Sequence, residues 1–191
     1  MAHKGFYFNQ ARCIGCRTCQ VACKDKNDLE IGVIYRKVDL FEVGEYPTAV
    51  SYPFSHTCNH CESPACVANC PTGAMRIDDE DGTVQHDDDV CIGCETCVKS
   101  CPYEVPQYRP ELKITGKCDG CLGLRNNGEA NACVASCPMR AIEFGDIDEL
   151  RAAHPDAADK IAVLPEPTTG PSVAIDAKPA ALEEGWFVSI I

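Results

Sequence analysis

Cysteine is the residue type in this protein whose number and spacing could do chemistry. The 191-residue sequence contains 16 cysteines, and a cysteine thiolate is both a nucleophile and a ligand for soft metal ions. The cysteines fall into four groups of four, which are Cys13, Cys16, Cys19 and Cys23; Cys58, Cys61, Cys66 and Cys70; Cys91, Cys94, Cys97 and Cys101; and Cys118, Cys121, Cys133 and Cys137. Grouping of this kind predicts metal binding.

The spacing within the groups is typical of iron–sulfur ligation. The third group reads C-x2-C-x2-C-x3-C and is followed by Pro102, which is the run that ligates [4Fe–4S] clusters in bacterial ferredoxins. The first group has the same spacing, and the second and fourth are wider variants that end in Cys-Pro. Three thiolates on a short loop, with Gly15 or Gly93 at its tight point, can hold three corners of a cubane. The last cysteine follows a helical turn and therefore ligates the neighbouring cluster.

Zinc and disulfide bonds are the alternatives to iron–sulfur clusters. Zinc sites also use C-x2-C pairs, but they join two distant pairs into one tetrahedron, so a third closely spaced cysteine would be a surplus ligand. That surplus occurs in two of the groups. The N-terminus has no apolar signal region, which disfavours the secreted context that disulfide scaffolds require. The repeated spacing favours clusters.

The order of predicted strands indicates which groups lie together. Residues 74–77 and 83–85 flank an Asp-Gly turn at 78–82 and predict a hairpin between the second and third groups. An extended aromatic run at 5–8 precedes the first group, and a predicted strand at 141–144 follows the fourth. These outer strands pair only if the first and fourth groups are neighbours, which favours a nested arrangement of the groups over a tandem one.

The sequence therefore predicts an α+β fold of two nested bacterial-ferredoxin-like units, with short hairpins, short helices and an extended C-terminal tail. The outer unit comprises residues 1–57 and 102–150, the inserted unit 58–101, and residues 151–191 form an extension that is expected to dock on a partner. Exchange of the last ligands gives four [4Fe–4S] clusters that use every cysteine, held by Cys13, Cys16, Cys19 and Cys137; Cys118, Cys121, Cys133 and Cys23; Cys58, Cys61, Cys66 and Cys101; and Cys91, Cys94, Cys97 and Cys70.

The net charge of the protein limits the partners it can have. Lys plus Arg is 17 and Asp plus Glu is 29, giving a net charge of −12, so phosphate backbones would repel it and nucleic-acid binding is disfavoured. Residues 1–40 contain seven bases against four acids. Because cations favour the reduced form of a cluster, a high potential of the first-group cluster is one interpretation of these bases. The interpretation that the sequence favours is that they are ordinary solvated side chains. Seven acids between residues 78 and 89 are expected to form a solvated rim.

Several other segments carry structural expectations. Asp146 is expected to cap a short helix at residues 147–153. Residues 165–191 contain several prolines and the only tryptophan, Trp186, and they are expected to pack on a partner. His60 lies between two cysteines and is expected to pack beside a cluster or lie at the surface, without ligating iron. No stretch approaches the roughly 18 apolar residues of a membrane span.

The four-group pattern resembles the iron–sulfur electron-transfer subunit of the dimethyl sulfoxide reductase family of molybdopterin oxidoreductases. The segments that carry the resemblance are residues 58–66, 101–108, 117–121, 137–145 and 148–150. The resemblance implies a non-catalytic subunit that relays electrons between a membrane subunit with a quinol site and a catalytic subunit that carries bis-molybdopterin guanine dinucleotide. It implies a role in anaerobic respiration, with the subunit peripheral at the cytoplasmic membrane as part of a complex.

The resemblance also implies an orientation. The cluster built on Cys13, Cys16 and Cys19 is expected to face the molybdenum subunit, and the cluster built on Cys91, Cys94 and Cys97 is expected to face the membrane side. Two other function classes remain open at this point, a free-standing polyferredoxin that carries electrons without fixed partners and a zinc-stabilised interaction protein.

Overall fold

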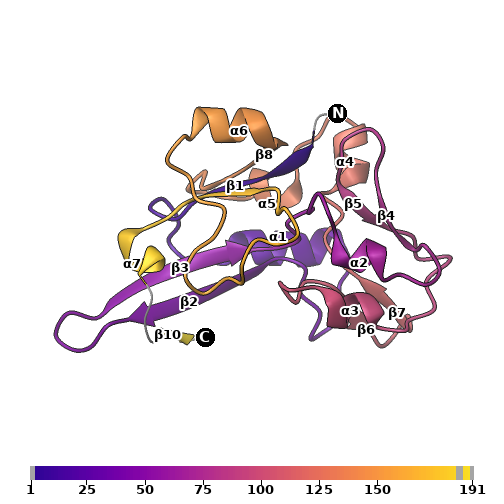
Figure 1. Ribbon diagram of the computed structural model, residues 1–191, viewed down its shortest axis with the longest axis horizontal. Coiled ribbons are helices and arrows are strands. Elements are labelled where there is room, and N and C mark those ends of the chain that lie inside the picture. Colours follow the sequence, from indigo (N-terminus) through magenta and orange to yellow (C-terminus); the bar gives the residue numbers. More distant parts are fainter. Residues whose placement is uncertain (1–2, 184–186, 190–191) are drawn as a thin grey trace.

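The computed structural model describes residues 3–183 and 187–189 and has an α+β fold of short elements (Figure 1). The strands of this part of the protein are β1 (Lys4–Asn9), β2 (Lys37–Val43), β3 (Val50–His56), β4 (Met75–Ile77), β5 (Val84–His86), β6 (Gln107–Arg109), β7 (Ile114–Gly116), β8 (Ile142–Asp146), β9 (Val173–Asp176) and β10 (Phe187–Ser189). The helices are α1 (Thr18–Lys26), α2 (Ala65–Ala68), α3 (Thr96–Ser100), α4 (Leu122–Asn126), α5 (Ala132–Ala135), α6 (Ile147–Ala153) and α7 (Pro179–Leu182). The predicted fold class is confirmed.

The central sheet, with strand order β8-β1-β9, joins the outermost parts of the sequence. β1 pairs antiparallel with β8 and parallel with β9, so the pairing predicted between the aromatic run and the strand after the fourth group is confirmed. Successive side chains of a strand point to opposite faces. Phe6 and Phe8 accordingly pack in the main core, while Tyr7 packs on the other face with Ile147 of α6.

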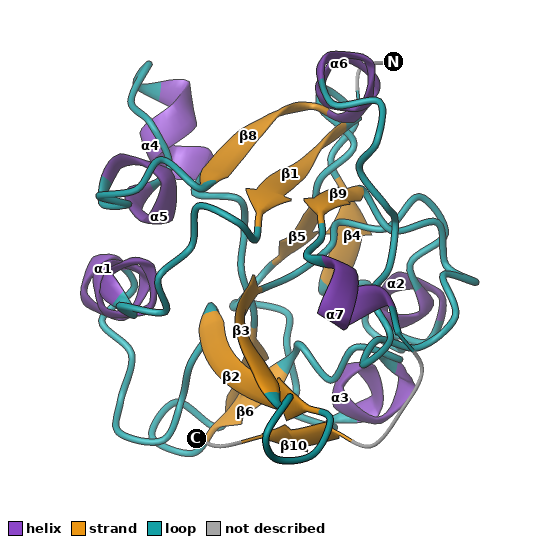
Figure 2. Ribbon diagram, turned by 90° about the vertical axis from the view of Figure 1, so that its left-hand side faces the viewer, coloured by secondary structure: helices purple, strands orange, loops and turns teal. Residues whose placement is uncertain are grey.

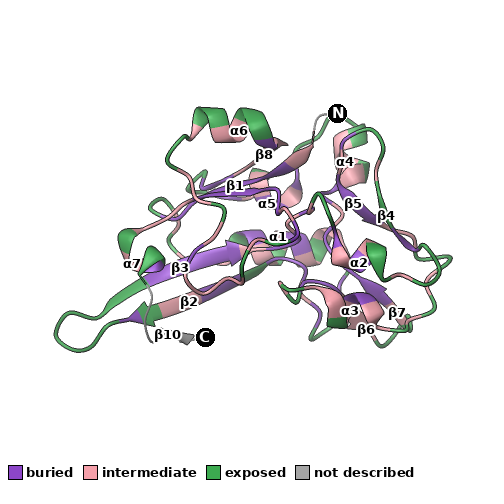
Figure 3. Ribbon diagram, viewed as in Figure 1, coloured by how far each residue is buried: buried purple, intermediate pink, exposed green. Residues whose placement is uncertain are grey.

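Two antiparallel hairpins lie between the first and third cysteine groups. The predicted hairpin is present as β4 and β5, with Met75 opposite His86 and Ile77 opposite Val84. A longer hairpin, β2–β3, extends away from the body of the molecule, and β10 pairs along β2 (Figure 1). The base of the β2–β3 hairpin is buried and its tip is exposed (Figure 3).

The helices that contain cysteines pack in two pairs. α1 contacts α5, and α2 contacts α3, on opposite sides of the molecule in Figure 2. Because α1 belongs to the first group and α5 to the fourth, the structure brings these two groups together. The second and third groups are neighbours in the same way, through α2 and α3.

The C-terminal segment packs on the rest of the protein to a larger extent than its composition suggests. β9 is part of the central sheet, and Ala174 and Ile175 are completely buried. Ile161 and Ala181, on either side of that strand, are buried as well. The extended tail is therefore a structural layer of the protein up to α7, while its docking on a partner stays a prediction. Trp186 lies outside the described residues.

The helix predicted after the fourth group is confirmed. The Asp146 carboxylate accepts hydrogen bonds from the backbone N–H groups of Asp148 and Glu149, which caps α6. Within residues 3–183 and 187–189, none of the helices has the length and apolar character needed to cross a membrane.

Candidate metal centres

Three hollows in the structure are each lined by four cysteines. These sets combine three cysteines of one group with the last cysteine of another. Site one is lined by Cys13, Cys16, Cys19 and Cys137; site three by Cys58, Cys61, Cys66 and Cys101; and site four by Cys70, Cys91, Cys94 and Cys97. Each is one of the sets that the sequence predicted, and a four-thiol hollow has the donor chemistry for an iron–sulfur cluster.

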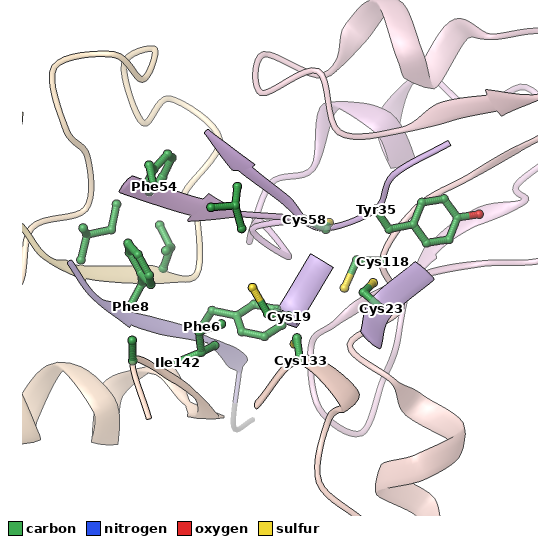
Figure 4. Packing of buried hydrophobic residues seen from close by; sticks show 14 of the residues in the cluster. Phe6, Phe8, Cys19, Cys23, Tyr35, Phe54, Cys58, Cys118, Cys133 and Ile142 are labelled. Atoms are coloured by element: carbon green, nitrogen blue, oxygen red, sulfur yellow. The ribbon is translucent and has the colours of Figure 1, made fainter. Parts of the chain in front are cut away.

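The remaining cysteines, Cys23, Cys118, Cys121 and Cys133, are called site two and are all buried. Burial, offset in part by the charge of Arg36, raises the pKa of Cys23 to about 11, and the thiols of Cys133 and Cys121 are close enough to add to the shift. Figure 4 shows Cys23 and Cys118 pointing toward one another at one end of the core. Such thiols give up their protons when a metal binds, because the thiolate is the ligand form.

The cysteine loops share a backbone conformation that fits this purpose. The residue before the second cysteine of every group has a positive φ, and these residues and angles are Gly15 at 69°, His60 at 43°, Gly93 at 64° and Gly120 at 63°. In the first and third groups the residue after the second cysteine, Arg17 or Glu95, is also left-handed and starts a helix. Such turns direct successive N–H groups inward and favour a bound anion.

Among the glycines of the cysteine loops, Gly93 is the one whose replacement the structure tolerates least. A Cβ atom there would lie 2.3 Å from the carbonyl oxygen of Lys113, whereas a Cβ atom at Gly15 would meet its nearest neighbour, Pro53, at 3.5 Å. Both positions have a left-handed φ that side chains other than glycine disfavour. The loop of site four is therefore tighter than the equivalent loop of site one.

Several polar groups approach the cysteine sulfurs. The backbone N–H groups of Gly120 and Ala141 donate to Cys118 Sγ and Cys137 Sγ at 3.3 and 3.4 Å. The Thr18 and Thr96 hydroxyls lie 3.3 Å from Cys16 Sγ and Cys94 Sγ, and these contacts lower the pKa of both thiols. Hydrogen bonds to the sulfurs are among the features that set a cluster's potential.

The cysteine sets are wider than a single-ion site. Among the residues that the structure describes, no three His, Cys, Asp or Glu side chains are close enough together to hold one metal ion. A zinc site would need ligands about 2.3 Å from a common centre. The hollows thus suit a group larger than one ion.

His60 packs between the cysteine sets as expected. Its side chain is completely buried, and Nδ1 accepts a hydrogen bond from the backbone N–H of Val84 at 3.0 Å. Burial lowers the pKa of His60 well below its usual value, and the nearby charges of Lys117 and Arg125 lower it further. His60 is therefore a neutral packing residue.

Two buried cations near the sites were not singled out from the sequence. Arg36 is 2% exposed and Lys117 is 4% exposed. Lys117 Nζ donates to the carbonyl oxygens of Val84 and Cys118 and lines site three. The sequence spacing of these two residues does not distinguish them from surface bases. The one local indication of a buried site is the position of Lys117 directly before Cys118.

The acidic segment at residues 78–89 is not wholly a solvated rim. Asp81 is 6% exposed, forms a close ion pair with Arg125 and accepts hydrogen bonds from Thr83. The expectation is wrong at this position, because Arg125 of α4 reaches across to the turn between β4 and β5. Asp79, Asp88 and Asp89 are exposed as expected.

Comparison with known proteins identifies relatives of nearly the full sequence. The family described as 4Fe-4S dicluster domain matches residues 49–147, and the family described as 4Fe-4S binding domain matches residues 10–27. The B subunit of the anaerobic dimethyl sulfoxide reductase of Escherichia coli K12 is 44% identical over 182 residues, which cover 90% of this protein and 87% of that subunit. The Haemophilus influenzae protein of the same name is 39% identical over 184 residues, covering 92% and 89%.

A third relative is described by its role in electron transfer. The thiosulfate reductase electron transfer subunit of Salmonella typhi is 40% identical over 148 residues, covering 74% of each of the two proteins. The family matches, together with the sixteen cysteines, support several [4Fe–4S] clusters, and four clusters are consistent with that number. This protein belongs to the 4Fe-4S dicluster family and is an iron–sulfur electron-transfer subunit homologous to the B subunit of anaerobic dimethyl sulfoxide reductase.

Proposed function

We propose that sites one to four each hold one [4Fe–4S] cluster and that electrons pass along them in the order one, two, three, four or its reverse. A bound cluster supplies one-electron redox chemistry. The protein's own residues hold it through four thiolates, surround it with N–H and hydroxyl donors, and exclude water from all but its outer edge. We also propose that residues 1–57 and 102–150 form an outer unit and residues 58–101 an inserted one.

The observation that carries this proposal is that each cysteine helix supplies neighbouring sites. α1 bears Cys19 of site one and Cys23 of site two. Cys66 lies in α2 and Cys70 lies two residues after its end, and they line sites three and four, respectively. Sites two and three meet at Cys118, which is buried and whose pKa is raised first by burial and then by Cys23 and Cys58. The sites therefore form a row, with one and four at its ends.

The two ends of the row are also the places where cysteines are accessible. Cys16 of site one and Cys94 of site four are exposed, and the other fourteen cysteines are buried or partly buried. Beside them, Ile14 and Ile92 are 63% and 66% exposed. Exposed apolar side chains around an accessible redox site suit a docking surface. We infer that electrons enter at one of these ends and leave at the other.

The partners follow from the relatives. The names of the relatives describe one of the subunits of a reductase and an electron transfer subunit, which supports membership of a multi-subunit reductase. We propose that site one faces a catalytic subunit with a bis-molybdopterin guanine dinucleotide cofactor and that site four faces a membrane subunit with a quinol site. The complex would then hold this protein peripherally at the cytoplasmic membrane. Co-purification with both partners at a fixed stoichiometry tests this part of the proposal and excludes a free-standing polyferredoxin.

Cysteine variants of the anaerobically prepared complex test the ligand sets. Four cubanes contain about sixteen irons, and removal of one should leave about twelve. Cys23→Ala and Cys118→Ala should each remove the site-two cluster, so the double variant should also retain about twelve irons and lack one EPR-active centre. The combination of Cys23→Ala with Cys58→Ala should instead leave about eight irons.

A tandem arrangement reverses those two results. If Cys23 ligated the cluster of Cys58, Cys61 and Cys66, the pair Cys23→Ala and Cys58→Ala would remove one cluster and the pair Cys23→Ala and Cys118→Ala would remove two. Stoichiometric zinc in the wild-type protein would contradict the proposal that these sites hold iron–sulfur clusters.

A further inference from the structure

Arg36 occupies an unusual position for a cationic side chain. It is 2% exposed and directly precedes β2. Its guanidinium carbon lies 4.6 Å from the centre of the Phe6 ring, and Nη1 donates to Ser55 Oγ at 3.1 Å. Nη2 is buried without a hydrogen-bond partner among the described residues. Removing a charge from water costs several kcal/mol unless an opposite charge compensates it.

Carboxylates do not supply that compensation. Within the described residues, the ion pairs of the protein leave Arg36 without an acidic partner. The nearest carboxylate on the same hairpin, Asp39, pairs with Lys37 and His56. The countercharge of Arg36 must therefore come from another kind of group.

The cysteines of two sites surround Arg36. Burial lowers the pKa of Arg36, but the nearby cysteines Cys133, Cys19, Cys118 and Cys23, when they are deprotonated, more than offset that effect and raise it. Three of these four cysteines belong to site two and one to site one. Ser55 completes the connection to site one, because its Oγ lies 3.4 Å from Cys19 Sγ and accepts the hydrogen bond from Arg36.

We propose that Arg36 is a fixed buried cation whose countercharge is the cluster pair at sites one and two, and that it raises the reduction potentials of both clusters. The proposal rests on the cluster ligation proposed above. A [4Fe–4S] cluster with four thiolates has a net charge of about −2, which becomes about −3 when one electron reduces it. A nearby cation stabilises the more negative form, so it favours reduction.

The buried position makes this charge different from the other bases of the N-terminal segment. Exposed charges are screened by salt, whereas buried charges are screened much less. Arg12 is exposed and Arg17 is partly exposed, so salt screens their influence on a cluster more than it screens that of Arg36. Of these three arginines, Arg36 is therefore the one that is expected to raise a cluster's potential, at site two as well as at site one. Arg36 is not a cluster ligand. It acts on the clusters through the electric field of its charge.

Redox titration of the intact complex, followed by EPR, tests the proposal. Arg36→Gln should lower two of the four midpoint potentials. The larger shift should be about a tenfold loss in the reduction equilibrium, or ~59 mV for one electron, and it should persist at high salt. Arg36→Lys keeps the charge and should restore both midpoints toward their wild-type values. Lys37→Gln removes one charge from the neighbouring, half-exposed residue and is the matched control, which should leave all four midpoints unchanged.

Iron analysis of the same samples separates this proposal from the ligation on which it rests. If Arg36→Gln retains about sixteen irons and all four midpoints equal those of the wild type, the role of Arg36 is overturned while the ligation stands. If Arg36→Gln loses clusters and Arg36→Lys retains them, the charge itself is required, which supports the proposal. Loss of clusters in both variants would make Arg36 a packing residue and would overturn it.

Discussion

At the scale of single residues, the backbone of the cysteine loops limits what can occupy them. Gly15 and Gly93 occupy equivalent positions, one residue before the exposed cysteine of site one and of site four. Both have a left-handed φ, but only the Cβ position at Gly93 is blocked by a carbonyl oxygen, that of Lys113. A substitution of the loop glycine is therefore tolerated better in site one than in site four.

Alanine variants at these two glycines should show that difference. Gly15→Ala should cost roughly 1–2 kcal/mol of stability from its left-handed backbone alone and should keep all clusters. Gly93→Ala adds a clash with backbone, so site four should lose its cluster or bind it weakly. Iron content and thermal unfolding of both variants measure this, and equal iron loss at the two positions would contradict it.

The buried ion pair between Asp81 and Arg125 predicts a second residue-scale effect. Asp81→Asn should destabilise the protein by about 3 kcal/mol, because Arg125 would remain buried beside a neutral partner. Asp79→Asn, in the same turn and exposed, is the control and should change stability by less than about 0.5 kcal/mol. Anaerobic denaturation followed by visible absorbance gives both values, and equal effects would argue against a structural role for the pair.

The same ion pair predicts how the stability difference between the wild type and Asp81→Asn depends on pH. Burial alone would raise the pKa of Asp81, but hydrogen bonds from Thr83 and Arg125 hold it below its ordinary value. The ionised carboxylate therefore contributes its full stability above the unfolded-state pKa of about 3.9, and the contribution is lost as the pH falls through the lower folded-state pKa. The difference between wild type and Asp81→Asn should be constant from neutral pH down to about pH 5 and should shrink below about pH 4.

At the scale of elements, the central sheet joins distant parts of the sequence. β1 lies between β8, which follows the fourth cysteine group, and β9, which lies in the C-terminal segment. The antiparallel pair brings the first and fourth groups together, and the parallel pair covers the other edge of β1. The arrangement of the cysteines thus depends on strands that contain none of them.

A variant in β9 should show that the C-terminal segment is structural. Ile175 is 0% exposed, so Ile175→Ala should destabilise the isolated subunit by about 2–5 kcal/mol. Ile31 is 99% exposed, and Ile31→Ala should leave stability within about 0.5 kcal/mol of wild type. If Ile175→Ala altered only the binding of a partner and not the unfolding of this subunit, the packing of β9 would contribute little to the fold.

At the scale of the whole molecule, the proposed row of sites would give the protein two ends with different roles. Cys97 is buried in site four, and this site is the one proposed to face the quinol-linked subunit. Because site four has a single neighbouring site, a change there should leave the other three clusters assembled. The row then loses its entry point and keeps its path to the catalytic subunit.

A Cys97→Ser variant of the complex should separate two activities. Its site-four cluster should be lost or converted to a three-iron form, which EPR detects. Turnover driven by quinol should fail, while turnover driven by a small dye that reduces the catalytic subunit directly should survive. Ser100→Ala on the same helix is the control for α3. Persistent quinol-driven turnover, or an equal fall in both activities, would show that the assigned direction is wrong.

Several features of the fold were readable from local sequence patterns. The outer strands, the β4–β5 hairpin and the helix capped by Asp146 depend on alternation, turn residues and a capping side chain, all of which act over a few residues. The position of β9 was not readable, since prolines interrupt any period in that segment and its burial comes from the distant strand β1. The burial of Asp81 was equally hidden, because Arg125 reaches it across 44 sequence positions.

The sequence by itself determined that this protein is an iron–sulfur electron carrier, because thiolate ligation depends on the type and spacing of residues such as Cys91, Cys94 and Cys97, which lie on one loop. The assignment of the last ligands to particular clusters stays a prediction. Only the tertiary structure decided which cationic side chains are buried near the cysteine sets. Arg36 has the same charge as Arg12 and Arg17 in the sequence, but folding buries Arg36 near two cysteine sets, while Arg12 stays exposed and Arg17 partly exposed. The strength of a charge's effect depends on the dielectric around it, and that surrounding is created by contacts between distant segments.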